Sequence, residues 1–185
     1  MDRLRLEASA MTGLMYLHHR CHVDERGAFN RVFCAETLLA AGMPATIAQI
    51  NHSITQRRGT VRGLHWQMPP NIERKIICCL RGKVFDVVVD LRRDAGTFLQ
   101  WQAIELSAET PLSLVVPAGF AHGFQALTDD AEMLYLHDQN YHAASSSGLR
   151  FDDPRLAISW PLPLTVISER DRTWPLLATD FAGCC

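Results

Sequence analysis

The sequence has no stretch long and apolar enough to cross a bilayer, which argues against an integral membrane protein. Residues 1–20 carry Asp2 and Glu7 and lack the continuous apolar core of a signal peptide. The formal net charge is only −2, so there is no general basic field to hold nucleic acid or an anionic membrane. We therefore expect a cytoplasmic protein that binds neither nucleic acid nor a membrane.

The six cysteines lack the spacing of a zinc or redox motif, because none stands in a CxxC pair. Cys78 and Cys79 are adjacent within an apolar run, where they are better interpreted as small hydrophobic residues than as halves of disulfides. Cys184 and Cys185 end the chain, and there we expect a frayed tail without a function. This pattern favours a reduced, cytoplasmic protein.

Repeats, linkers and helical patterns are scarce as well. The 185 residues suit one well-filled domain, 1–185, and no composition shift divides it. Only AETLLAAG (35–42) predicts a helix, which Gly42 would end. We expect the extension 142–185 to hold loops and at most a short helix, because its turn-forming residues follow no regular period.

What the sequence does contain is a series of short apolar runs separated by turn formers. The predicted strands lie at 46–53, 60–67, 75–80, 83–91, 101–106, 112–117, 123–127 and 131–138. The runs that flank Arg81 and Gly82 predict a tight hairpin in which Gly82 supplies a positive φ. So many short strands with almost no helix between them predict an all-β antiparallel sandwich or barrel.

The run RGLHWQ (62–67) puts His65 on the same face of its predicted strand as Gly63. A small residue beside a histidine leaves the space that a ligand site needs, but a core histidine bonded to a backbone carbonyl fits equally well. Lys75 also fits a snorkelling edge lysine, and Tyr135 a core aromatic whose hydroxyl reaches solvent. The residue types alone leave these alternatives open.

His122 lies in PAGFAHGF (117–124), which resembles the second motif of cupin barrels, where the histidine is often a metal ligand. The first cupin motif normally has two histidines one residue apart and then a glutamate. Here Gln67 stands where the second histidine would be, and Glu73 follows. A metal-dependent cupin using His65, Glu73 and His122 is therefore one alternative.

Ordered motifs along most of the chain resemble the dTDP-4-dehydrorhamnose 3,5-epimerase family of the cupin superfamily. They run from about Asp24 to about Asp171 and include QINHS (49–53), GTVRGLHWQ (59–67), RGKVFDVVVDLR (81–92), VPAGFAHGFQAL (116–127) and ISERD (167–171). The resemblance implies a jelly-roll, cupin-type barrel that is a homodimer and uses no metal or other cofactor. It also implies an isomerase that inverts C3, C5 or both of a dTDP-4-keto-6-deoxyhexose through an enolate, in deoxysugar biosynthesis.

The resemblance implies a catalytic role for four residues. His65 matches the base that abstracts the proton, and Asp171 matches the carboxylate that orients this base. Lys75 matches the cation near the keto oxygen, where negative charge develops. Tyr135 matches the acid that returns a proton on the opposite face of the sugar.

The resemblance also implies a set of substrate contacts. Arg62 matches a residue that binds the diphosphate, for which a guanidinium is well suited. Arg26 matches an arginine that reaches into the site of the partner subunit, so we expect the N-terminal strands at the dimer interface. The other implied substrate-binding residues are Gln49, Asn51, His122, Tyr141 and Phe29.

Arg62 and His65 raise a geometric conflict. They are three residues apart, so ideal alternation puts them on opposite faces of a strand, although both should touch one ligand. Glycine within a strand often marks a bulge. We therefore predict a bulge or twist near Gly63.

Some positions depart from the family pattern. Ala28 stands where a phenylalanine is typical and Arg31 where an acid is typical, and Leu136 and His137 replace the usual lysine and threonine after the tyrosine. The nucleotide rim is thus altered, which leaves open the nucleotide base, the sugar, the inverted centre and the pathway, whether for a surface polysaccharide or a natural product. A non-catalytic sugar-nucleotide binding module is the remaining alternative.

Overall fold

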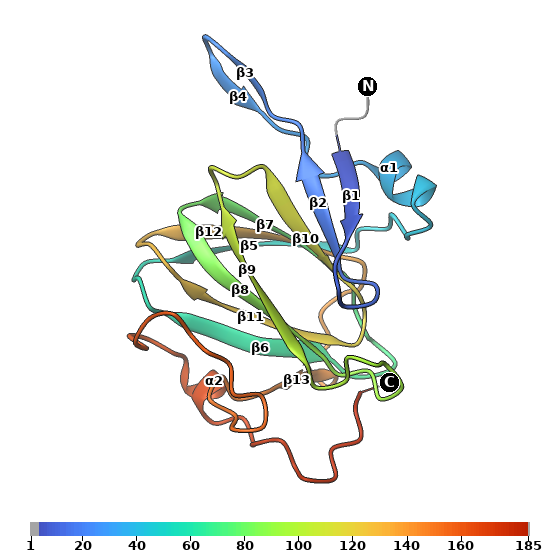
Figure 1. Cartoon of the computed structure of the whole chain (residues 1–185), viewed down its shortest axis with the longest axis vertical. Helices are drawn as coiled ribbons and strands as arrows, with labels where there is room; N and C mark the ends of the chain where they lie inside the picture. The colour runs from blue at the N-terminus through green and yellow to red at the C-terminus, as the bar shows by residue number, and fades with distance from the viewer. Residues whose placement is uncertain (1–3, 185) are drawn as a thin grey trace.

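The computed structural model describes residues 4–184, and two antiparallel sheets face each other across a shared core (Figure 1). In spatial order the first sheet holds β1 (Leu4–Ala8), β2 (Met15–His19), β10 (Leu112–Val116), β7 (Lys75–Arg81), β12 (Ala131–His137) and β5 (Gln49–Thr55). The second holds β13 (Ser146–Gly148), β6 (Val61–Gln67), β11 (Phe120–Ala126), β8 (Lys83–Asp90) and β9 (Trp101–Ser107). This is the predicted jelly-roll, cupin-type fold.

The core lies between the two sheets because their strands alternate apolar residues toward it. Ile77 and Met133 of the first sheet are fully buried in one cluster with Val88 and Phe124 of the second. The predicted helix is confirmed as α1 (Ala35–Ala40), followed by Gly42 at a φ of +71°. No helix among residues 4–184 is long and apolar enough to span a membrane.

The predicted hairpin between β7 and β8 is wrong. β7 pairs with β10 and β12, whereas β8 pairs with β11 and β9 in the other sheet. Gly82 does take a positive φ of +70°, but the turn carries the chain from one sheet to the other. A tight turn only reverses the chain, and the ladder partners are chosen by distant strands that the local sequence does not reveal.

The predicted irregularity at Gly63 is confirmed. Along β11 the step from His122 to Phe124 spans two residues, while the matching step along β6 from His65 to Arg62 spans three. Gly63 has a φ of +118°, and a Cβ there would lie 2.5 Å from the Cα of Gly123 on β11. The bulge removes the strict alternation between Arg62 and His65.

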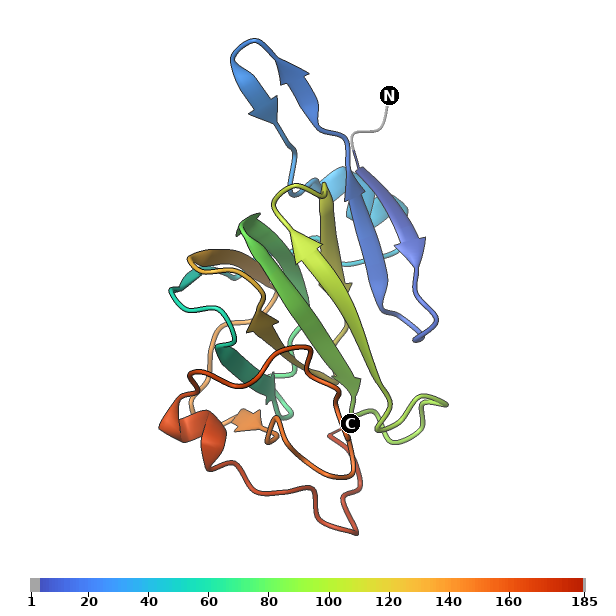
Figure 2. The ribbon, with the colours of Figure 1, turned by 60° about the vertical axis from the view of Figure 1, so that its left-hand side comes forward.

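The C-terminal extension passes along the outside of β6, as the orange-to-red segment in Figures 1 and 2 shows. It contributes β13 to the sheet edge and contains the short helix α2 (Glu169–Arg172). The expected frayed tail is wrong for Cys184, which is 6% exposed and whose N–H donates to the Leu91 carbonyl at 2.9 Å. Cys185 lies outside the described residues.

Cys78 and Cys79 are buried free thiols, in agreement with their interpretation as small hydrophobic residues. Burial raises the pKa of each thiol to about 11. Neither side chain is therefore a thiolate near neutral pH.

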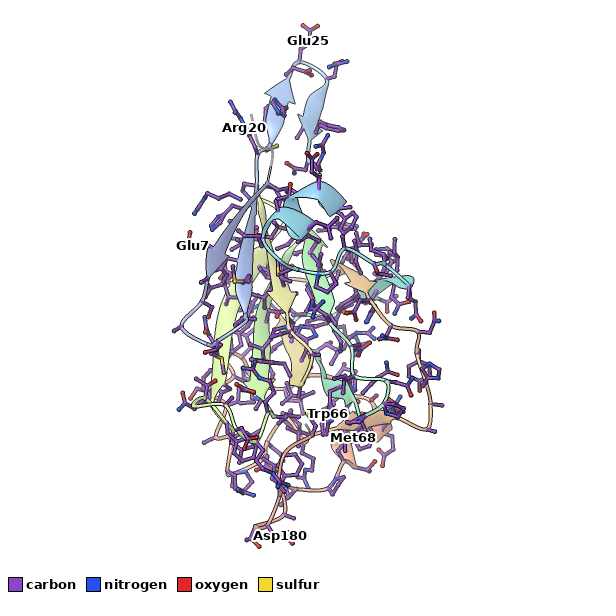
Figure 3. The ribbon with its side chains drawn as sticks, turned by 90° about the vertical axis from the view of Figure 1, so that its right-hand side faces the viewer. Glu7, Arg20, Glu25, Trp66, Met68 and Asp180 are labelled. Atoms are coloured by element: carbon purple, nitrogen blue, oxygen red, sulfur yellow. The ribbon has the colours of Figure 1, made fainter. Side chains whose placement is uncertain are left out.

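A hairpin of β3 (His22–Asp24) and β4 (Gly27–Phe29) projects from the body of the molecule (Figure 1). Figure 3 shows Glu25 at its tip, far from Trp66 and Met68 on the barrel. Every residue of both strands is exposed, and Val23 and Phe29 are 77% and 58% exposed. Exposed apolar side chains on a projecting arm are typical of a protein–protein contact.

The bulge predicts a large stability difference between two glycine substitutions. Gly63→Ala should lower the free energy of unfolding by at least about 2 kcal/mol, because the new Cβ meets backbone atoms at a strained φ. Gly96→Ala is the matched control, since a Cβ at Gly96 has no heavy atom within 4 Å. Urea unfolding of both variants measures the difference, and equal stabilities would contradict the close approach of β6 and β11.

Candidate active site

A cavity of about 540 Å³ opens between the β5–β12 edge of the first sheet and strands β6 and β11 of the second, next to the C-terminal segment 166–171. Seven residues with roles implied by the sequence line it together. They are Asn51, Arg62, His65, Lys75, His122, Tyr135 and Asp171. Residues from five strands and the C-terminal segment thus converge on one volume.

His65 and Asp171 form the closest polar pair of this cavity. The distance from His65 Nε2 to Asp171 Oδ1 is 2.6 Å, and Asp171 is 4% exposed. Asp171 Oδ2 accepts a second hydrogen bond, from the Gly63 N–H at 3.2 Å, and its own N–H donates to the Ser168 hydroxyl at the start of α2. Helix α2 therefore holds the carboxylate, while the bulge supplies a backbone donor to it.

The Asp171 carboxylate is an ionised partner for the imidazole. Burial raises its pKa, but the hydrogen bond and charge of His65 and the N–H of Gly63 outweigh burial, so the pKa lies below its ordinary value. An ionised carboxylate at Nε2 keeps the proton on that nitrogen. This leaves the lone pair of Nδ1 to accept a proton.

Tyr135 comes from β12, in the sheet opposite to that of His65. Its hydroxyl lies 3.3 Å from the Ser53 hydroxyl on β5, and its ring meets the His122 ring edge-on. Burial raises the pKa of the phenol above its ordinary value, although the bond to Ser53 acts against this. The phenol is therefore protonated near neutral pH and can act as an acid.

Lys75 is 6% exposed and pairs with Glu73, with 2.9 Å between Nζ and Oε1. Its Nζ also donates to the backbone carbonyl of His65 at 3.4 Å. Lys75 is thus a buried, partnered ammonium at the cavity wall and not a snorkelling edge lysine. Such a group can stabilise negative charge that develops on a nearby ligand oxygen.

Arg62 lines the cavity at its open side and is exposed. Its Nε donates to the Thr55 hydroxyl at 3.0 Å, and Nη2 donates to the Ile54 carbonyl at 3.1 Å. These two bonds to β5 fix the guanidinium and leave its other donor groups for an anion.

The geometry does not support the metal alternative. His65 bonds to Asp171, Glu73 bonds to Lys75, and His122 Nε2 lies 2.8 Å from Asp86 Oδ2 in a buried pair. Within residues 4–184 there is no group of three His, Cys, Asp or Glu side chains that could hold a metal ion. His65, Glu73 and His122 therefore do not come together as one ligand group.

Four residues implied to contact substrate do not line this cavity. Gln49 lies at its edge, where its Nε2 donates to Asn51 Oδ1 at 3.0 Å and its Oε1 accepts from the Tyr141 N–H at 3.0 Å. The Tyr141 side chain is 55% exposed. Arg26 and Phe29 lie on the projecting hairpin, where Arg26 is paired with Asp24.

Sequence reasoning missed three residues that shape the site: Ser53, Asp86 and His137. Asp86 carried a signal, because an acid within the apolar run VFDVVVD needs a buried partner. His137 was visible only as a departure from the family pattern. Its Nδ1 lies 2.9 Å from Glu73 Oε2, and its ring packs near Tyr135.

The arrangement can move protons across a bound ligand. His65 stands on one sheet, with the Asp171 carboxylate of α2 behind it, and the protonated phenol of Tyr135 stands on the other sheet. The Lys75 ammonium comes from β7, next to β12. A base and an acid on facing sheets can remove a proton from one side of a carbon and return one on the other side.

Comparisons with known proteins agree with this geometry. The sequence model described as dTDP-4-dehydrorhamnose 3,5-epimerase matches residues 8–179. The dTDP-4-dehydrorhamnose 3,5-epimerase of Streptomyces griseus is 42% identical over 161 residues, covering 86% of this chain and 80% of that protein. The dTDP-4-dehydrorhamnose 3-epimerase of Streptomyces niveus is 35% identical over 176 residues, covering 95% and 84%.

Among solved structures, the dTDP-4-dehydrorhamnose 3,5-epimerase of Bacillus anthracis with TDP and PPi bound superposes with a TM-score of 0.91. It is 37% identical, and the match covers 94% of this chain and 99% of that one. On the match of the family model, the relatives and the fold, this chain belongs to the dTDP-4-dehydrorhamnose 3,5-epimerase family of isomerases.

Proposed function

We propose that this protein epimerises a dTDP-linked 4-keto-6-deoxyhexose at C3, at C5 or at both, in the cytoplasmic synthesis of a deoxysugar. The observation that carries the proposal is the His65–Asp171 pair, which faces the protonated phenol of Tyr135 across one cavity. A binding module needs neither a base with an ionised carboxylate behind it nor an acid on the opposite wall. The 4-keto group is required because it acidifies the adjacent C–H bonds.

In the proposed reaction, His65 Nδ1 takes the proton from the carbon next to the carbonyl. The electron pair of the broken C–H bond forms the carbon–carbon double bond of the enolate while the carbonyl π pair moves to the keto oxygen, whose negative charge the Lys75 ammonium stabilises. Tyr135 then donates its proton to the opposite face of the same carbon, and solvent restores both groups. No carbon changes its oxidation state over the cycle, so the reaction needs no redox cofactor.

The nucleotide half of the substrate is proposed to lie toward Arg62. Its guanidinium is held by β5 at the open side of the cavity, and guanidinium donors match phosphate oxygens. The relative that contains TDP and PPi supports a site of this kind. Asn51, Gln49 and Tyr141 lie along the same edge and are the proposed rim for the rest of the nucleotide.

We further propose that the catalyst is a homodimer, with the N-terminal strands at the interface. The hairpin that carries Arg26 and Phe29 projects from the body of the molecule, and neither residue lines the cavity of its own chain, so in the proposed dimer they would contribute to the neighbouring site. The exposed Val23 and Phe29 are apolar surface that such an interface would cover.

Solvent exchange tests the proposed reaction. In D₂O, the protein should incorporate deuterium into a dTDP-4-keto-6-deoxyhexose, because each protonation draws on the solvent. Mass spectrometry with NMR locates the label: C3 and C5 for a 3,5-epimerase, C3 alone for a 3-epimerase. The absence of any label, with matched dTDP sugars that lack the keto group as the background control, would contradict the proposal.

A mixed dimer tests the role of Arg26. Arg26→Ala and His65→Asn should each be nearly inactive alone, the first for lack of the arm contact and the second for lack of the base. After subunits are mixed in equal amounts, about a quarter of the wild-type activity should return, because half of the random dimers are mixed and each holds one complete site. Full activity of Arg26→Ala alone, or no recovery on mixing, would contradict the shared site.

A further inference from the structure

Glu73 is a buried carboxylate that joins two different parts of the cavity wall. Its side chain is 10% exposed and precedes β7. Oε1 pairs with Lys75 Nζ at 2.9 Å, while Oε2 accepts from His137 Nδ1 at 2.9 Å and from Gln67 Nε2 at 3.4 Å. Lys75 and His137 are directly opposite each other in the ladder of β7 and β12. The Glu73 carboxylate therefore connects Lys75, which is proposed to stabilise the enolate oxygen, to the imidazole of His137, which has no role in the proposed reaction.

The hydrogen bonds of His137 have one consistent direction. A carboxylate only accepts, so Nδ1 carries the proton that is donated to Glu73. Nε2 is then an acceptor, and it accepts a hydrogen bond from Asn51 Nδ2 at 3.3 Å. With both ring nitrogens engaged, His137 has none left to exchange a proton with a substrate.

The same direction continues to the rim of the cavity. The Asn51 amide that donates to His137 presents its Oδ1 to Gln49 Nε2 at 3.0 Å, and Gln49 Oε1 accepts from the Tyr141 backbone at 3.0 Å. One chain of donors thus runs from the proposed nucleotide rim to Glu73. Lys75 donates to the other oxygen of the same carboxylate.

We propose that His137 is a positioning residue that acts on Lys75 through Glu73. His137 thereby links the rim formed by Asn51, Gln49 and Tyr141 to the site where Lys75 stabilises the enolate oxygen. His137 holds one carboxylate oxygen in place, so the other oxygen presents the Lys75 ammonium at a fixed point. The inference rests on the proposed function, in which Lys75 stabilises the enolate.

The charge of Glu73 shows what the imidazole contributes. Burial raises the pKa of this carboxyl, but the hydrogen bond from His137 and the charge of Lys75 lower it to about 2. Without His137, the buried Glu73 carboxylate depends on Lys75 for more of its stabilisation. The Lys75 ammonium then interacts less strongly with a substrate oxygen. Loss of His137 should therefore reduce the stabilisation of the transition state more than it reduces the affinity for the substrate.

Substitution of His137 by asparagine or by glutamine distinguishes the roles of its two ring nitrogens. An asparagine side chain places an N–H near the position of Nδ1, and a glutamine side chain places its amide near that of Nε2. We expect His137→Ala and His137→Gln to lower kcat for deuterium exchange by about tenfold to a hundredfold, the range for a hydrogen bond to a charged group, with KM changed by less than about threefold. His137→Asn should stay within about threefold of wild type. Equal losses in His137→Asn and His137→Gln, or a loss confined to KM, would overturn the proposal.

A double-mutant cycle tests whether the effect passes through Glu73. In a Glu73→Gln background, His137→Ala should cost less than about threefold in kcat, because the carboxylate that His137 positions is already gone. The same loss in both backgrounds would mean that His137 acts by another route and would overturn the proposal. Thermal midpoints of the four proteins identify any variant that is simply unfolded.

A measurement without substrate separates this inference from the proposed function. The pKa of Glu73, followed by the NMR signal of its carboxyl carbon, should rise from about 2 toward its ordinary value in His137→Ala and remain low in His137→Asn. A Glu73 pKa that does not respond to His137→Ala would overturn the inference, whatever the activity. A wild-type protein that exchanges no deuterium would instead contradict the proposed function.

Discussion

The Asp171 carboxylate is the contact on which the site depends. One oxygen accepts a hydrogen bond from His65 and the other accepts one from the Gly63 N–H, so a single side chain binds both the imidazole and the backbone of β6. Gly63 has no ladder partner on β11 because the register shifts there, and this leaves its N–H for Asp171. The bulge, the base and the C-terminal segment are therefore parts of one hydrogen-bonded local structure.

Elsewhere in the cavity wall, buried polar groups are also matched with carboxylates. Lys75 has Glu73, His122 has Asp86, and all four side chains are nearly or fully buried. An unpaired charge at such positions would cost several kcal/mol, so the pairs are a condition for placing polar groups inside a barrel at all. The result is a cavity whose donors and acceptors are oriented before a ligand arrives, and such preorganised groups can stabilise charge that develops on a bound ligand.

Local patterns were sufficient for the eight strands β5 to β12 and for α1, because alternation, apolar runs and turn residues are properties of short segments. They did not predict the strands β1 to β4 or β13. The bulge at Gly63 was predictable once the family resemblance assigned Arg62 and His65 to one ligand, since a regular strand would put them on opposite faces. Which strands pair was not predictable: the Arg81–Gly82 turn joins two sheets and not two arms of a hairpin. The same holds for His65 and Asp171, which are 106 residues apart and meet only in the folded chain. Their pairing was available through the family resemblance alone. His137 was noticed as a departure, but its contact with Glu73 depends on the register of β7 and β12.

In the proposed reaction, one side of the cavity removes a proton and the other side returns it. The most direct test compares His65→Asn with Tyr135→Phe in D₂O, with exchange and inversion measured on the same sample. His65→Asn should lose exchange by at least about a hundredfold, the usual contribution of a general base. Tyr135→Phe should still exchange the abstracted proton and yet form little inverted product. Near-normal exchange in His65→Asn, or complete inversion at the wild-type rate in Tyr135→Phe, would contradict the account.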